Sequence, residues 1–328
     1  MQRPPINLAF LGCGRIARTH SRTLSSFRSA VRCYYASRDP VKAAAEARHF
    51  GGSGSFGSYA AALVDDRVDT IFVTTPPDSH LDLTLAALEH GKNVIVEKPA
   101  FLRAADCAVV QTAVARHGGR VLVAENYCYK PLARTLRKII DSGVLGDLRF
   151  FHLNAVKYQQ TKGWRDSSSL AGGGALFEGG IHWIDLLANV GLRVEAVHGF
   201  RPGDWGAPER SMLVVAEYEE GAVGTLTHSW EITSKLRGLR LSHIYGTRGS
   251  ISFESNGLFV LITGSSPRIL FPGLRDISGY RSMFRDFITA LQTGSEPVMS
   301  LGRAQRGLEL IEMAYQNVMA PPELERVP

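Results

Sequence analysis

A glycine turn near the start of the chain constrains the fold more than any other feature of the sequence. The apolar run 6–12 leads directly into Gly12-Cys13-Gly14-Arg15-Ile16-Ala17, which opens a helical pattern. In a GxGxxA turn the first glycine permits the tight bend, the second lets the backbone approach a phosphate, and the alanine keeps the helix close to the strand. Because free N–H groups at a helix start favour anions, the turn predicts that these residues hold the pyrophosphate of a dinucleotide. The alternative is an ordinary strand–helix turn without a ligand.

The first part of the chain alternates strand-like and helical runs. Short apolar, β-rich runs occur at 6–12, 31–37, 69–75, 93–98 and 120–126. Helical patterns lie between them, and Gly91 and Gly118 stand where helices are expected to end. Apolar strands that alternate with helices indicate a parallel sheet covered on both faces. We therefore expect residues 1–125 to form an α/β, doubly wound Rossmann domain.

A different rhythm begins after residue 125. Runs that alternate as antiparallel strands do lie at 148–157, 211–232, 239–255 and 257–263. Helical patterns lie at 131–143, 281–294 and 302–319. We expect residues 126–328 to form a second, α+β domain with a large, mostly antiparallel open sheet.

The composition is that of an ordinary globular protein, with 45% hydrophobic and 21% charged residues in a chain of 328. Its four cysteines show no CxxC or other metal-binding spacing, so we expect reduced thiols and no metal site. A net charge of +6 suits an anionic small molecule, and the arginines form no basic stripe of the kind that binds nucleic acid. Without a signal-peptide pattern or an apolar run of about 20 residues, we expect a cytoplasmic protein with no membrane partner.

The end of the second predicted strand bears on the choice between NAD and NADP. An acidic residue there binds the ribose 2′-hydroxyl of NAD, whereas an arginine accommodates the 2′-phosphate of NADP. Ser37 and Arg38 occupy this position and Asp39 follows slightly late, which favours NADP over NAD. Asp39-Pro40 is also a good pair for the start of a helix, and Asp39 is then a cap and Arg38 merely an exposed side chain.

Three further motifs point to one family. TPPDSH (75–80) follows the third predicted strand, EKP (97–99) closes the fourth, and GGGALFEGGIHWID (172–185) lies in the second domain. With the glycine turn, they resemble the glucose–fructose oxidoreductase / inositol dehydrogenase / rhizopine-catabolism family (Gfo/Idh/MocA) over essentially the whole chain. The resemblance implies an NAD(P)-dependent oxidoreductase that interconverts a secondary alcohol and a ketone on a sugar, polyol or sugar derivative. It also implies a homodimer or homotetramer formed through the sheet of the second domain.

The resemblance assigns roles to individual residues. Lys98 matches the family's catalytic lysine, which a cis peptide often follows, and His182 matches its histidine. The residues expected to line the cofactor, with Glu97 at the nicotinamide ribose, are Thr75, Pro76, Pro77, His80, Glu97, Lys98 and Asn126. The sequence departs from the family at two positions, since Glu178 replaces an aspartate and Cys128 replaces a common arginine. The first departure lengthens a carboxylate arm, and the second changes the expected substrate pocket.

The reaction requires one proton transfer besides the hydride that a nicotinamide carries. A histidine, or a lysine whose pKa is lowered, suits this transfer near neutral pH. We expect His182 to be the general acid/base, Lys98 to hydrogen-bond the reacting oxygen, and Glu178 to orient the histidine four residues later. Gly179 and Gly180 indicate a close approach, either of a nicotinamide or substrate ring or of a packed neighbour; in the second case His182 is a core histidine.

Several residues of the second domain and its approach are candidates for substrate contact. Trp164-Arg165 suits stacking on a sugar and bidentate contact to hydroxyl or carboxylate groups, unless it is a surface turn with one packed indole. The other candidates are Tyr127, Lys130, Lys157, Tyr158, Gln160 and Asp185. The residues expected to be structural or to lie at an interface are Trp183, His228, Trp230 and His243.

Two other functions are compatible with these motifs. A tightly held dinucleotide can oxidise a substrate transiently and so enable elimination or glycoside cleavage without net redox change. A non-enzymatic regulator that only senses the dinucleotide is the second alternative. Such a regulator is expected to lack the lysine or the histidine, and both are present.

Overall fold

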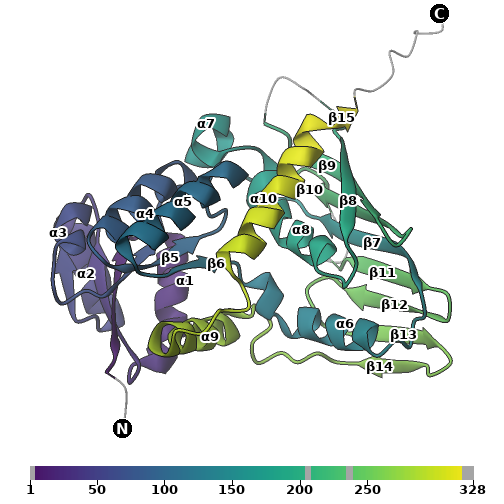
Figure 1. Ribbon diagram of the computed structural model, residues 1–328, viewed down its shortest axis with the longest axis horizontal. Helices are drawn as coiled ribbons and strands as arrows, with labels where there is room; N and C mark the ends of the chain where they lie inside the picture. The colour runs from purple at the N-terminus through teal and green to yellow at the C-terminus, as the bar shows by residue number, and fades with distance from the viewer. Residues whose placement is uncertain (1–3, 204–207, 234–238, 320–328) are drawn as a thin grey trace, which may run out of the picture. The chain divides into compact units, whose positions relative to one another are not determined.

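The computed structural model describes residues 4–203, 208–233 and 239–319. The chain forms two compact units (Figure 1). The first unit comprises Met1–Tyr129 and Gly279–Gln305, and the second comprises Lys130–Ser278 and Arg306–Pro328.

The first unit contains a six-stranded parallel sheet with the order β3-β2-β1-β4-β5-β6. Its strands are β1 (Ile6–Leu11), β2 (Val31–Ala36), β3 (Gly54–Phe56), β4 (Thr70–Val73), β5 (Asn93–Glu97) and β6 (Val121–Ala124). This arrangement confirms the predicted doubly wound α/β fold. The strand order reverses between β1 and β4, and ligands of such sheets bind beside the carboxyl ends of the strands at that point.

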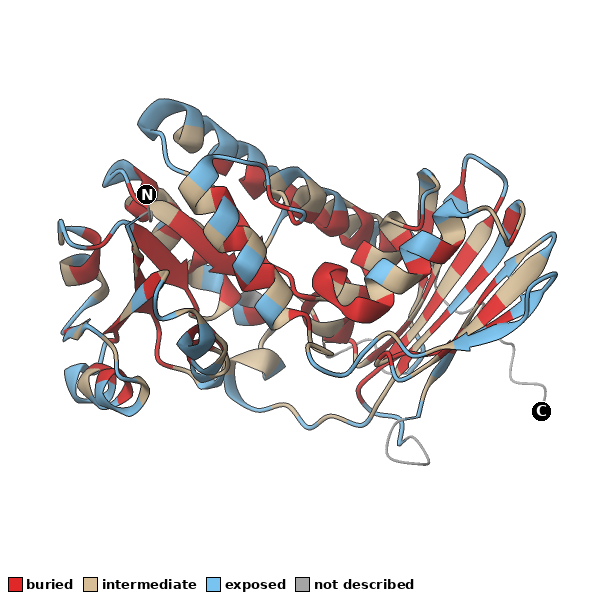
Figure 2. Ribbon diagram, turned by 90° about the horizontal axis from the view of Figure 1, so that it is seen from below, coloured by how far each residue is buried: buried red, intermediate tan, exposed pale blue. Residues whose placement is uncertain are grey.

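Helices surround the parallel sheet. They are α1 (Arg15–Leu24), α2 (Pro40–Phe50), α3 (Tyr59–Leu63), α4 (His80–Glu89), α5 (Ala104–His117) and α9 (Tyr280–Thr293), with 3-10 turns η1 (Ser25–Phe27), η2 (Pro77–Ser79) and η3 (Tyr127–Tyr129). Consecutive residues of β4 are all buried, so both faces of the sheet are covered (Figure 2). Over the described ranges, no helix has the length and apolar character needed to cross a membrane.

Helix α9 belongs to the first unit although it lies late in the sequence. The ring of Phe284 lies 5.3 Å from that of His20 on α1, and the Tyr129 hydroxyl donates a hydrogen bond of 2.7 Å to Asp286. The sequence-based division assigned all of 126–328 to the second domain, whereas residues 126–129 and 279–305 pack with the first unit. The apolar face of α9 shows that the helix is amphipathic, but does not show which sheet it covers.

The second unit contains a nine-stranded sheet with the order β14-β13-β12-β11-β7-β10-β9-β8-β15. Its strands are β7 (Leu148–Val156), β8 (Val194–Phe200), β9 (Ser211–Tyr218), β10 (Val223–Ser229), β11 (Leu241–Gly246), β12 (Gly249–Glu254), β13 (Val260–Gly264), β14 (Arg268–Leu270) and β15 (Val318–Met319). Neighbours run antiparallel except in the pairs β7–β10 and β8–β15. The predicted, mostly antiparallel sheet is therefore confirmed.

The two faces of this sheet differ. The helices and helical turns of the unit are α6 (Pro131–Asp141), η4 (Gly163–Asp166), α7 (Ser168–Ala171), the π-helical η5 (Leu176–Gly180), α8 (Ile181–Ala188) and the later part of α10 (Leu301–Gln316). Helix α8 and η5 pack on β10, and burial alternates along β7 and β9 (Figure 2). Exposed apolar side chains on the strands are Phe150, Leu241, Tyr245, Leu261 and Ile269. One face thus forms a core with the helices, while the other is open.

Candidate cofactor and active site

The turn between β1 and α1 has the geometry that a bound pyrophosphate requires. Gly12 has φ +103°, and a Cβ atom there would lie 3.0 Å from the Thr74 carbonyl oxygen, so only glycine fits. Gly14 is the N-cap of α1, and a Cβ atom there would meet nothing within 4 Å. Ala17 is buried at 2% exposure. The turn is therefore tight at its first glycine and open at its second.

The start of α1 leaves its N–H groups available to an anion. Gly14 offers no side-chain cap, and the first turn, which includes exposed Arg15 and half-buried Ile16, contains no acidic residue. Cys13 is buried with its Sγ atom 3.6 Å from the Ala36 carbonyl oxygen, and burial raises the pKa of its thiol to about 11. The turn thus presents backbone N–H groups and a neutral thiol, which fits a dinucleotide pyrophosphate.

The end of β2 holds the residues expected to distinguish NAD from NADP. The Asp39 carboxylate accepts the backbone N–H groups of Val41 and Lys42 at 3.0 and 3.2 Å and caps α2. The buried Ser37 hydroxyl accepts the Asp39 N–H at 3.2 Å, and Arg38 is exposed. The cap predicted as an alternative role of Asp39 is confirmed.

The side chain of His80 contacts the backbone of the loop after β4. Thr75 and Pro76 are half-buried and Pro77 is buried, whereas the His80 side chain is 1% exposed. Its Nδ1 lies 3.0 Å from the Pro99 carbonyl oxygen and its Nε2 lies 2.9 Å from that of Thr75. Burial lowers the pKa of this imidazole. The His80 ring thus links the loop after β4 to the segment after Lys98, and its predicted place among the residues that line the cofactor stays a prediction.

Lys98 follows β5 directly and is half-buried. The peptide between Lys98 and Pro99 is cis, as the family resemblance implies. Glu97 is buried, its Oε1 is hydrogen-bonded to His20 Nε2, and its Oε2 accepts the Lys98 backbone N–H at 3.1 Å. Both carboxylate oxygens of Glu97 therefore have hydrogen-bond partners within the protein. The contact of Glu97 with the nicotinamide ribose stays a prediction.

The segment after β6 is largely buried. Asn126 is 5% exposed, and Tyr127 is half-buried with its N–H donating to Glu125 Oε1 at 2.8 Å. Cys128, at the position of the family's arginine, is buried with its Sγ 3.4 Å from the Glu125 carbonyl oxygen. The departure at Cys128 thus places a small buried thiol where the family commonly has a long cation.

In the second unit, the predicted substrate residues Trp164 and Arg165 are joined to Glu178. Arg165 Nε donates to Glu178 Oε1 at 2.7 Å, and its guanidinium lies 4.3 Å from the centre of the Trp164 ring. Glu178 is buried at 8% exposure, and Arg165 is half-buried. The longer carboxylate arm therefore reaches an arginine, an ion pair that the sequence did not predict.

The two glycines after Glu178 make room for the protein's own side chains. A Cβ atom on Gly179 would lie 2.9 Å from Trp230 Cζ2 and 3.2 Å from His228 Nε2, and one on Gly180 would lie 2.6 Å from Leu176 Cδ1. The space beside both glycines is thus occupied by side chains of the protein itself. These contacts favour the alternative of helix packing for the glycines, because η5 lies against β10 and the residues that follow it. His182, however, is half-buried on α8 and is not the core histidine that this alternative assumed.

The other predicted residues are placed as follows. His182 is half-buried on α8, while Asp185 on the same helix is buried and accepts a hydrogen bond from Asn189 at 3.2 Å.

Trp183, His228 and Trp230 are buried, as predicted for structural residues. Lys157 lies over the Trp230 ring at 5.9 Å, and the exposed Tyr158 forms an isolated bridge with Glu231. Gln160 Nε2 donates to the Tyr158 hydroxyl at 3.5 Å, Lys130 is buried, and half-buried His243 contacts Ser252 Oγ at 2.9 Å.

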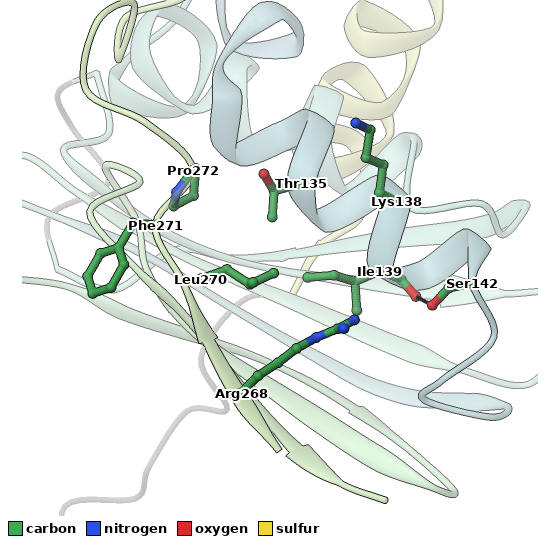
Figure 3. A pocket seen from close by; sticks show the side chains of 8 residues that line it. All are labelled: Thr135, Lys138, Ile139, Ser142, Arg268, Leu270, Phe271 and Pro272. Carbon is green, nitrogen blue, oxygen red and sulfur yellow. Dashed lines mark hydrogen bonds between the residues drawn. The ribbon is translucent and has the colours of Figure 1, made fainter. Parts of the chain in front are cut away.

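A cavity of about 320 Å³ lies between α6 and β14 and contains none of the predicted residues. It is lined by Thr135, Lys138, Ile139, Ser142, Arg268, Leu270, Phe271 and Pro272. Figure 3 shows that Arg268 extends toward Ile139 and Ser142, while Phe271 points away from α6. The carbonyl end of α6 faces this region, which suits the arginine but disfavours an anion.

Sequence reasoning missed two residues around Glu97. His20 is fully buried on α1, and Tyr280 from α9 packs its ring 5.2 Å from that of His20. Burial raises the pKa of Tyr280, and the nearby Glu97 and Glu125 charges raise it further. A helical spacing of three residues after the buried Ala17 could have indicated that His20 faces the sheet. No local pattern points to Tyr280.

Comparison with known proteins identifies the family. Residues 6–125 match the oxidoreductase family model with an NAD-binding Rossmann fold (GFO_IDH_MocA), and residues 133–252 match the GFO/IDH/MocA C-terminal domain. The chain is 28% identical over 261 residues to Oxidoreductase P35 of Formosa agariphila, covering 76% of this chain and 79% of that protein. It is 25% identical over 290 residues to levoglucosan dehydrogenase of Pseudarthrobacter phenanthrenivorans, covering 76% and 73%.

A solved structure shows the same fold. Levoglucosan dehydrogenase in complex with NADH and levoglucosan has a TM-score of 0.84 at 21% identity, covering 95% of this chain and 97% of that one. The two family models together span more than half of the chain and fall on both of its domains. The chain therefore belongs to the Gfo/Idh/MocA family of NAD-binding oxidoreductases.

Proposed function

We propose that this oxidoreductase uses NAD(P) to interconvert a secondary alcohol and a ketone on a sugar, a polyol or a sugar derivative. The observation that carries the proposal is the position of Lys98. It follows β5, which neighbours β4, and β4 in turn neighbours β1, whose end forms the glycine turn. Since parallel strands end at one edge of a sheet, a lysine is held close to where a dinucleotide binds. The names of three relatives, levoglucosan dehydrogenase, inositol 2-dehydrogenase and D-glucoside 3-dehydrogenase, support the substrate class.

When bound, the nicotinamide accepts or donates the hydride. In the oxidising direction His182 accepts the hydroxyl proton as the carbon loses its hydride, and in the reducing direction it returns that proton. The Lys98 ammonium hydrogen-bonds the same oxygen and stabilises the negative charge that develops on it. Glu178 assists substrate binding through its ion pair with Arg165. This ion pair holds the guanidinium over the Trp164 ring, where it can contact substrate hydroxyl groups.

We further propose that NADP is preferred over NAD. Asp39 Oδ1 accepts two backbone N–H groups at the start of α2, so this carboxylate already serves as the cap of that helix. The adjacent Arg38 is exposed and can pair with a 2′-phosphate. A kcat/KM that favours NADP supports this preference, and a strong preference for NAD refutes it.

A panel of polyols and keto-sugars, assayed with both dinucleotides, tests the proposed reaction. Absorbance of the reduced nicotinamide should change with at least one substrate, and product analysis should show one carbinol converted to a ketone or the reverse. A substrate consumed without change in absorbance, giving an elimination or cleavage product, would instead support the redox-assisted lyase or glycosidase. Dinucleotide binding without turnover across a broad panel would favour a sensor.

A further inference from the structure

The fully buried imidazole of His20 lies behind the end of β5 in the first unit. It projects from α1 at 0% exposure, and its Nε2 is hydrogen-bonded to Glu97 Oε1. Its ring lies 4.8 Å from that of Phe72, and the rings of Tyr280 and Phe284 meet it nearly at right angles at 5.2 and 5.3 Å. Burial of a polar ring among aromatic neighbours is unfavourable unless its hydrogen bond compensates. The bond to Glu97 is therefore the polar contact that His20 makes in an otherwise apolar environment.

Glu97 connects this histidine to the lysine of the active site. The carboxylate is 6% exposed, and its second oxygen accepts the backbone N–H of Lys98 at 3.1 Å. A buried carboxylate depends on such donors, because water does not compensate for a lost one. Loss of the imidazole donor would therefore allow the carboxylate to turn away, and the peptide of Lys98 would lose its fixed acceptor.

Hydrogen bonding also defines the tautomer of His20. A carboxylate oxygen only accepts, so Nε2 carries the hydrogen. Nδ1 is buried and has no hydrogen-bond partner within the described residues. The imidazole thus acts on one side only, as a donor to Glu97. A side chain of similar shape that lacks the N–H group removes that donor and retains most of the packing.

We propose that His20 is a positioning residue for Lys98 and acts through Glu97. The inference rests on the proposed role of Lys98 in catalysis. Helix α1 begins at the dinucleotide turn, and His20 lies six residues after Gly14, about 9 Å along the helix. The helix whose first turn faces the pyrophosphate therefore also fixes the peptide that carries the lysine.

Three variants separate this role from simple packing. His20→Phe fills the aromatic surroundings but has no donor, whereas His20→Gln offers an amide N–H to the carboxylate. Glu97→Gln keeps the size of the side chain and removes its charge, and it carries the test if His20→Phe does not fold. His49→Phe, at an exposed position on α2, is the matched control.

Chemical labelling measures the reactivity of the Lys98 amine, which depends on its position and surroundings, without any substrate. The rate of Lys98 acylation by trace acetic anhydride is followed by mass spectrometry over neutral and alkaline pH, relative to the exposed Lys42 of the same molecule. His20→Phe and Glu97→Gln should change this ratio by about threefold or more, and His20→Gln should restore it, since a charge-assisted hydrogen bond is lost and then replaced. His49→Phe should leave it unchanged.

Turnover gives the second readout. His20→Phe should lower kcat by about tenfold with little change in dinucleotide affinity, and His20→Gln should recover most of that loss. Wild-type labelling and kcat in folded His20→Phe and Glu97→Gln would overturn the inference, as would a His20→Gln variant no better than His20→Phe. If Lys98→Ala retained full turnover, the proposed function would fail instead, and the labelling ratio would still show whether His20 positions the lysine.

Discussion

Replacement of Gly179 by alanine distinguishes a glycine needed for packing from one needed for a ligand. The new Cβ atom would lie 2.9 Å from Trp230 Cζ2, 3.1 Å from its Nε1 and 3.2 Å from His228 Nε2. Both neighbours are buried, at 3% and 2% exposure, so neither can move into solvent. Overpacking of this kind costs about 1–3 kcal/mol, and alanine returns about 0.5–1 kcal/mol of backbone preference. We expect a net loss of about 1–2 kcal/mol from the free energy of unfolding.

Thermal and urea unfolding of Gly179→Ala measure this loss. A loss of this size lowers Tm by about 3–6 °C for a unit of this length. Gly307→Ala on α10 is the matched control, because its Cβ atom would meet nothing within 4 Å. That variant should gain about 0.5–1 kcal/mol. Unchanged or increased stability of Gly179→Ala, together with lost turnover, would refute the packing explanation and restore the ligand explanation.

Three further predictions concern charge, cofactor and assembly. Burial raises the pKa of Glu209, so the folded state retains a proton that the unfolded state releases. The free energy of unfolding should therefore fall as pH rises from about 4.5 through the folded pKa. Glu209→Gln keeps an acceptor for the Leu176 N–H and the Tyr315 hydroxyl, and it should reduce this pH dependence in urea titrations. Arg38→Ala should lower kcat/KM for NADP by about tenfold and leave that for NAD within about twofold, and equal losses with both would refute the phosphate contact. We propose that a homodimer forms through the open sheet face, so Phe150→Glu at 59% exposure should shift the mass measured by light scattering to that of a monomer, and an unchanged mass would contradict that interface.

Periodicity predicted most of the regular elements, because their signals are local. The strands that became β1, β2, β4, β5 and β6 were each predicted within a few residues of their bounds. Strand β3 was missed because Gly54–Phe56 is too short to show alternation. Strand β8 (Val194–Phe200) was missed although Val194, Ala196 and His198 alternate with neighbours, because glycine and histidine weaken its apolar pattern.

The site residues could be predicted from the sequence where the local backbone conformation demands a particular residue type. Gly12 requires a positive φ and Asp39-Pro40 starts a helix, and both features are visible in the sequence. The contacts between distant residues were not predictable. His20 and Glu97 are 77 residues apart and Arg165 and Glu178 are 13 apart, and neither pair leaves a local pattern. The sequence likewise shows that Gly179 lacks a side chain, but it does not show which distant residues fill the space beside it.

The central claim is that Lys98 and His182 act on one substrate hydroxyl beside a bound dinucleotide. Its most direct test is kcat of Lys98→Ala and His182→Ala on the first substrate identified, with dinucleotide affinity measured in parallel by fluorescence. The exposed Lys162→Ala and His117→Ala serve as matched controls. Each active-site variant should lose about 10²–10⁴-fold in kcat while its dinucleotide Kd stays within about threefold of the wild-type value. Turnover within about twofold of wild type in either folded variant would contradict the claim.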